Sequence, residues 1–96
     1  MSRDAIIALL RANKAKLDEL NVKSLAILGS VARGDDRPDS DLDVLVEYEG
    51  DVTWKKYIAL KRLIENITGR DVDLSTRDTV QPFAWSIISK DMVDVS

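Results

Sequence analysis

Carboxylates near a glycine-serine pair are the residues of this chain whose types and spacing could carry chemistry. Gly29 and Ser30 are followed, after ten intervening residues, by Asp41 and Asp43, and Asp73 lies thirty residues further on. Carboxylates held a few ångströms apart repel one another, and a hard divalent cation removes that penalty. We therefore expect Asp41, Asp43 and Asp73 to bind Mg²⁺ beside a turn that holds phosphate groups.

The turn itself has residues suited to phosphate binding. Gly29 has no Cβ, so the backbone can approach a ligand closely, and Ser30 is expected to begin a short helical turn with free N–H groups and a hydroxyl. Arg33 and Arg37 could neutralise phosphate charge; the alternative for Arg33 is a surface ion pair. Such a site suits displacement at phosphorus with two metal ions, in which Asp73 helps to take the proton from the nucleophile.

Hydrophobic periodicity predicts the elements that would position these residues. Two strands joined through residues 29–40 would be antiparallel, and a helical crossover would make the third strand parallel to the second, so that the three acids converge. The expected strands are 23–28, 41–48, 71–75 and an edge strand at 92–95, and the expected helices are 4–20 with Ser2 as N-cap, 53–68 ended by Gly69, and Pro82 to Ser89.

Composition excludes several classes of function. The 96 residues contain neither histidine nor cysteine, which removes thiol nucleophiles, thiolate zinc sites and imidazole acid–base chemistry. The net charge of −3 argues against nucleic acid as a direct partner. The apolar runs are far too short for a membrane span and the first residues too acidic for a signal peptide, so we expect a cytoplasmic protein with one domain over residues 1–96.

The motifs resemble those of a known superfamily. Gly29-Ser30, the ten-residue spacer and Asp41-x-Asp43, followed by a strand with Asp73, look like the polymerase-β-type nucleotidyltransferases. The longer stretches GSVARGDDRPDSDLDVLVEY and GRDVDL resemble the minimal nucleotidyltransferase (MNT) branch over nearly the whole chain. The resemblance implies an α/β (α+β) nucleotidyltransferase fold, a small mixed β-sheet flanked by helices. In it the glycine-serine pair would bind the nucleotide triphosphate, and the paired aspartates would bind both metals with Asp73 as third acid.

The resemblance also implies a partner. Family members of this size are commonly encoded beside a HEPN-domain ribonuclease toxin that they neutralise, and some transfer AMP from ATP to a tyrosine of that toxin. We therefore expect a Mg²⁺-dependent adenylyltransferase with ATP as substrate, in a hetero-oligomer with a HEPN toxin. The alternatives are an antitoxin that only masks the toxin by binding, and transfer to a small-molecule acceptor, which the lack of a second substrate domain disfavours.

The remaining polar and aromatic residues receive structural interpretations. Asp35, Asp36 and Asp39 are expected to be exposed loop residues. The cations of the second helix are expected on its solvated face: Lys55, Lys56, Lys61 and Arg62. Three aromatic residues fit either the core or a partner surface, and the sequence leaves that open: Trp54, Phe83 and Trp85.

Overall fold

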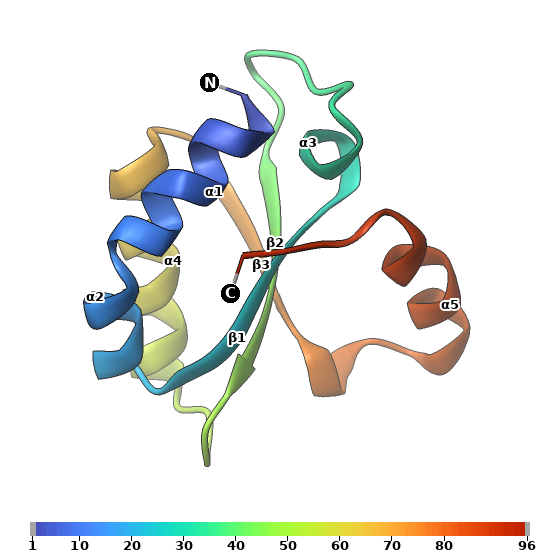
Figure 1. The fold of residues 1–96 in the computed structure, drawn as a ribbon. Coiled ribbons are helices and arrows are strands. Elements are labelled where there is room, and N and C mark those ends of the chain that lie inside the picture. The colour runs from blue at the N-terminus through green and yellow to red at the C-terminus, as the bar shows by residue number, and fades with distance from the viewer. Residues whose placement is uncertain (1, 96) are drawn as a thin grey trace.

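Residues 2–95 are described by a computed structural model, in which they form a four-stranded sheet with helices against both faces (Figure 1). The strands are β1 (Val22–Leu28), β2 (Leu42–Tyr48), β3 (Val72–Thr76) and β4 (Val93–Asp94). The helices are α1 (Arg3–Ala12), α2 (Lys14–Glu19), α3 (Gly29–Arg33), α4 (Trp54–Thr68) and α5 (Pro82–Asp91), with a 3₁₀ turn, η1, at Arg77–Thr79.

The sheet has the mixed topology that the sequence predicts. Its strand order is β3-β2-β1-β4. β1 and β2 are antiparallel, β2 and β3 are parallel through the crossover helix α4, and β4 pairs antiparallel with the outer side of β1. The two pairings on which the site depends are therefore confirmed, and so is the short terminal edge strand.

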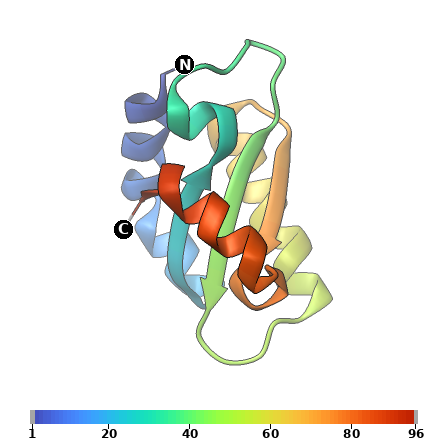
Figure 2. The same cartoon turned by 90° about the vertical axis from the view of Figure 1, so that its right-hand side faces the viewer.

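Two hydrophobic clusters hold the sheet from its two faces. Alternate residues of β2, Leu42, Val44 and Val46, are fully buried in the main core beneath α1, α2 and α4. On the other face, Leu45 lies in a smaller cluster that α5 covers. Figure 1 shows α1, α2 and α4 together on one side of the sheet, and Figure 2 shows α5 crossing in front of the opposite face. The central strand β2 is therefore packed on both of its faces.

The prediction of one helix over residues 4–20 is wrong, because the helix is interrupted at Asn13. The backbone of Asn13 leaves helical geometry at ψ 21°, and its side-chain amide donates to the carbonyl of Leu9 at 2.8 Å. Asparagine side chains compete with helical hydrogen bonds in this way. The predicted start is confirmed, since the Ser2 hydroxyl accepts from the backbone N–H of Ala5 at 3.2 Å.

The other predicted elements are present, with bounds that differ by one or two residues. Gly69 ends α4 in the left-handed region at φ 70°, as predicted. Thr53 caps the start of that helix by accepting from the N–H of Lys56. On the predicted solvated face of α4, Lys55 and Arg62 are exposed, whereas Lys56 and Lys61 are half-buried.

The structure separates the three aromatic residues that the sequence left open. Trp54 is 76% exposed and Phe83 is 73% exposed. Trp85 is half-buried against the smaller core cluster, with the Arg77 guanidinium 3.6 Å above its ring. Two of the three therefore lie on the surface. Within residues 2–95, no helix combines the length and apolar character that a membrane crossing requires.

Candidate active site

Strand register places Asp43 and Asp73 side by side on one face of the sheet. In the parallel ladder of β2 and β3, Asp43 pairs with Asp73. In the antiparallel ladder of β1 and β2, Asp43 pairs with Leu28, so that Gly29, the next residue, begins α3 beside it. The two acids and the glycine turn, which are far apart in the sequence, meet at one end of the sheet.

A cavity of about 310 Å³ lies at this junction between the sheet and α5. Its wall includes four of the six predicted site residues, Gly29, Arg33, Asp43 and Asp73. The remaining wall residues were not predicted: Leu28, Ser75, Ile87, Ile88 and Asp91. The three from α5 could not be found from motif spacing, because only tertiary packing places that helix over the strand ends.

The carboxylate of Asp43 lies directly against the backbone of Gly29. A Cβ at position 29 would overlap Oδ2 of Asp43, inside the 3.0 Å that Cβ atoms keep from other heavy atoms. Gly29 also has φ +69°, a conformation that side-chain-bearing residues rarely adopt. Glycine is therefore needed here both for the turn and for the position of the acid.

Asp43 is half-buried close to two other acidic residues. Its pKa is raised above the ordinary value, first by burial and then by the charges of Asp73 and Asp41, while Arg33 acts in the opposite direction. A half-buried carboxylate next to other carboxylates is stabilised by a cation. The donor set, hard oxygens of aspartates with no histidine or cysteine in the chain, fits Mg²⁺.

Asp41, the third predicted metal ligand, lies outside the wall of the cavity that Asp43 and Asp73 line. Asp41 is exposed and lies just before β2, on the same face as Asp43 by strand alternation. Among residues 2–95, no three acidic side chains already stand close enough to form a metal-binding group. Ser30 is half-buried as the second residue of α3, so the predicted short helical turn at the glycine-serine pair is present.

Arg33 is held in two exposed ion pairs. Its guanidinium lies 3.2 Å from the carboxylate of Asp35 and 3.9 Å from that of Asp91 at the end of α5. Exposed pairs of this kind contribute roughly 0–1 kcal/mol, so they do not fix the side chain strongly. The structure therefore shows the surface ion pairs of Arg33 and places the residue in the cavity wall, while its contact with phosphate stays a prediction.

The prediction that Asp36 is an exposed loop residue is wrong. Its carboxylate lies 2.7 Å from the guanidinium of Arg70, and the two side chains are only 15% and 11% exposed. The hydrogen bond from Arg70 lowers the pKa of Asp36. Arg70 also donates to the carbonyl of Ser40 at 3.4 Å, so it joins the loop before Asp41 to the turn before β3. Asp35 and Asp39 are exposed, as predicted.

Side chains of α4 hold the outer edge of β3, the strand that carries Asp73. The Tyr57 hydroxyl donates to the carbonyl of Leu74 at 2.6 Å, and Glu65 accepts from the N–H of Val72 at 3.0 Å. These contacts satisfy backbone groups on both sides of Asp73 along β3, an edge strand of the four-stranded sheet. The position of Asp73 is therefore set by α4 as well as by β2.

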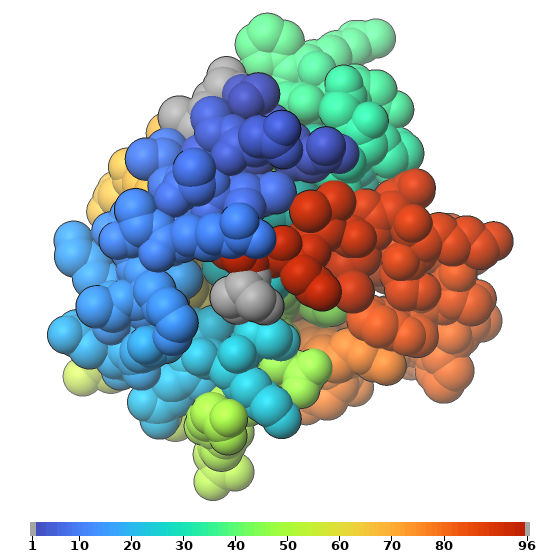
Figure 3. All heavy atoms as spheres, viewed as in Figure 1, coloured from blue at the N-terminus to red at the C-terminus, as the bar shows by residue number. Residues whose placement is uncertain are grey.

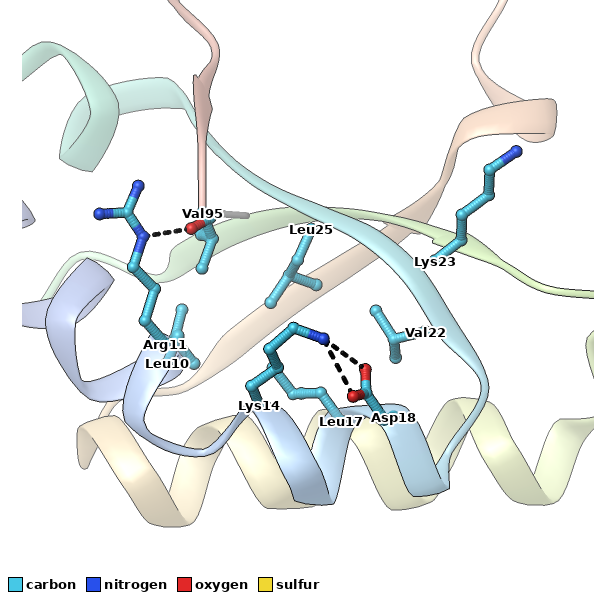
Figure 4. Close-up of a pocket in the computed structure, with 9 residues that line it drawn as sticks. All are labelled: Leu10, Arg11, Lys14, Leu17, Asp18, Val22, Lys23, Leu25 and Val95. Atoms are coloured by element: carbon cyan, nitrogen blue, oxygen red, sulfur yellow. Dashed lines mark hydrogen bonds and ion pairs between the residues drawn. The ribbon is translucent and has the colours of Figure 1, made fainter.

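A larger cavity, of about 440 Å³, lies on the other face between α1, α2 and β1 (Figure 4). Its walls are mainly aliphatic, including Leu10, Leu17 and Leu25. Its polar groups already have partners: Lys14 pairs with Asp18, Arg11 donates to a main-chain carbonyl, and Lys23 pairs with Glu47 outside the cavity wall. It holds no cluster of carboxylates, so the smaller cavity beside Asp43 is the candidate active site.

Comparison with protein families and curated proteins gives a consistent result. Residues 7–95 match the family model of the nucleotidyltransferase domain. A Methanocaldococcus jannaschii protein with the provisional name protein adenylyltransferase is 35% identical over 91 residues, 91% of each chain. The protein adenylyltransferase MntA of Thermococcus cleftensis is 29% identical over 96 residues, which cover 99% of this chain and 97% of that protein.

Solved structures share the fold. A protein described provisionally as a minimal nucleotidyltransferase superposes with a TM-score of 0.83 at 28% identity, over 97% of this chain and 95% of its own. A toxin–antitoxin complex with AMP-PNP contains a chain that matches with a TM-score of 0.70 at 19% identity, over 100% of this chain and 73% of its own. A complex of a tri-AMPylated Shewanella oneidensis HEPN toxin with an MNT antitoxin contains a chain that matches with a TM-score of 0.59 at 14% identity. The match covers 90% of this chain and 71% of that chain.

Proposed function

The chain belongs to the nucleotidyltransferase domain family, and we propose that it transfers AMP from ATP to a tyrosine hydroxyl of a HEPN toxin and so acts as its antitoxin. The observation that carries the proposal is the pairing of Asp43 with Asp73 beside Gly29 in one cavity. The relatives named as protein adenylyltransferases support a protein acceptor. The toxin–antitoxin structures with the same fold support the choice of partner and of ATP.

The acids of the cavity would hold the metal. Asp43 and Asp73, with Asp41 just before β2, supply oxygen ligands suited to Mg²⁺. When bound, such ions neutralise the phosphates and the charge that develops during displacement at phosphorus. Packing on both faces of β2 fixes the backbone that carries Asp43.

The transfer reaction assigns a role to each remaining site residue. The acceptor oxygen forms a bond to the α-phosphorus of ATP, the bond from that phosphorus to the bridging oxygen breaks, and pyrophosphate leaves. The acceptor proton passes to Asp73, which is the more exposed of the paired acids. Gly29 and Ser30 bind the triphosphate through the backbone and the hydroxyl.

Arg33 is available for the phosphates because its present partners hold it weakly. Its two ion pairs are exposed, whereas hydrogen bonds to a charged phosphate contribute about 1.5–3 kcal/mol. A nucleotide in the cavity would therefore draw the guanidinium away from Asp35 and Asp91. Arg33 then balances charge on the leaving pyrophosphate.

Incubation with ATP labelled at the α-phosphate, Mg²⁺ and the HEPN partner tests the function. Label should appear on the partner. Asp43→Asn or Asp73→Asn should each reduce the rate of AMP transfer by at least ~10²–10³-fold. Asp39→Asn is the matched control, because Asp39 is an exposed acid of the neighbouring loop. Undiminished transfer by Asp43→Asn would refute the role of the carboxylates. Stable binding of the partner with no label would instead establish an antitoxin that acts by masking.

A further inference from the structure

Two large apolar side chains stand together on the outer face of α5. Phe83 is 73% exposed and Ile87 is 66% exposed. Residues four apart on a helix are neighbours on one face, so the two side chains form a continuous patch, which we name the α5 ridge. Single exposed apolar residues are ordinary on protein surfaces, whereas adjacent large ones mark interaction sites more often.

The ridge is held outward because the opposite face of α5 is anchored to the sheet. Trp85 and Ile88 pack on Leu28 and Leu45, and the Arg77 guanidinium lies over the Trp85 ring. At about 100° per residue, Trp85 and Ile88 point away from the direction of the ridge. Rotating α5 to bury the ridge would expose Trp85 instead. Figure 3 shows the C-terminal segments, orange to red, forming one side of the molecule.

The ridge is continuous with the candidate active site. Ile87 lines the same cavity as Asp43 and Asp73, and Phe83 lies one helical turn away from it. A protein that inserts a side-chain hydroxyl into this cavity has to cover Ile87, and its adjoining surface then meets Phe83. A small acceptor molecule would leave Phe83 in water.

Resting on the function proposed above, we propose that the α5 ridge docks the acceptor protein. The partner surface it fits carries apolar side chains next to the hydroxyl that receives AMP. Burial of two large apolar side chains would supply affinity, while the carboxylates supply the chemistry. The ridge would thereby determine which hydroxyl of the partner reaches the α-phosphate.

Trp54 provides a matched comparison. It is a similarly exposed aromatic residue, 76%, but it stacks on Tyr57 at 5.6 Å and lies at the start of α4. The shallow cavity beside it shares only Ser75 with the wall of the candidate active site. Trp54→Ser therefore removes an exposed aromatic of similar size without changing the ridge.

The experiment measures the affinity of the chain for the HEPN partner by titration calorimetry, and the rate of AMP transfer to it. Phe83→Ser and Ile87→Ser should each raise the Kd by about tenfold or more, and the KM for the partner should rise more than kcat falls. Trp54→Ser should leave the Kd within about twofold of the wild type. Melting temperatures establish that each variant is folded, as expected for such exposed positions.

Unchanged affinity for the partner in both ridge variants would overturn the docking proposal. A loss of affinity seen only in Trp54→Ser would overturn it as well, and so would a wild-type chain that does not bind the partner. Loss of self-association of the chain, seen by sedimentation with partner affinity unchanged, would assign the ridge to a second copy and overturn it too. Ridge-dependent binding without label transfer supports docking and refutes the proposed reaction. Transfer that is independent of the ridge supports the reaction and refutes docking.

Discussion

Gly29→Ala is the most informative single substitution, because it tests the contact between the glycine turn and Asp43. The new Cβ would overlap Oδ2 of Asp43, so the carboxylate has to move or the turn has to open. Displacing a catalytic group by about 1 Å costs on the order of 10²-fold in rate. We expect a loss of AMP transfer of that size even though the substitution adds only one methyl group.

The same substitution also carries a backbone cost that has to be separated from the overlap. At φ +69° an alanine is destabilised by about 1–2 kcal/mol, and each kcal/mol lowers the Tm by roughly 4–8 °C in a domain of this size. Gly69→Ala is the matched control, because Gly69 has φ +70° and open space where a Cβ would stand. Gly69→Ala should lower the Tm and retain transfer at temperatures where it is folded.

A double-mutant cycle isolates the overlap. In an Asp43→Ala background Oδ2 is absent, so Gly29→Ala should cost only as much stability as Gly69→Ala does. In the wild-type background Gly29→Ala should cost more. Thermal melts followed by circular dichroism measure all of these differences. Equal costs in the two backgrounds, together with unimpaired transfer by Gly29→Ala, would refute the geometry described for the site.

Further predictions concern pH dependence, a buried hydroxyl and a helix cap. The Arg70 hydrogen bond lowers the pKa of Asp36, so the stability from this pair is present above the ordinary Asp pKa of 3.8 and is lost as pH falls through the lowered value. The Tm difference between the wild type and Asp36→Asn should therefore close in acid, and an exposed-acid control, Asp39→Asn, should show no such trend. The buried hydroxyl of Tyr48 finds no hydrogen-bond partner among residues 2–95, so Tyr48→Phe should leave the urea midpoint unchanged or raise it; a clear decrease would reveal a partner. Thr53 caps α4, so Thr53→Ala should cost about 1 kcal/mol in urea unfolding, and no loss would show that the cap contributes nothing.

Local patterns were sufficient to predict the elements that hold the candidate active site. The alternation of Leu42, Asp43 and Val44 predicts a strand with acids on one face and aliphatic residues on the other, and the structure has that strand. The glycine-serine pair predicts a turn and a short helix, which is α3. The interruption at Asn13 was missed because asparagine within a helical pattern lowers helix propensity only slightly.

The ion pair of Asp36 with Arg70 could not be predicted, since 34 residues separate the two and no periodicity relates them. The same holds for Asp91, which meets Arg33 only because α5 folds over the strand ends. Helical spacing did not distinguish Trp85, which packs on the sheet, from Phe83, which faces solvent. Each of these features depends on which face of an element meets another element.

The sequence by itself determined which residues could bind metal and phosphate, because carboxylate chemistry, glycine geometry and strand alternation are local properties. Tertiary structure decided whether they meet. A one-residue slip between β2 and β3 would turn Asp73 away from Asp43. The observed register is fixed by the buried residues on both faces of the sheet and by the hydrogen bonds between α4 and the backbone of β3. Tertiary structure alone also left Ile87 exposed at the cavity and Phe83 exposed one helical turn away, since the opposite side of α5 covers the sheet.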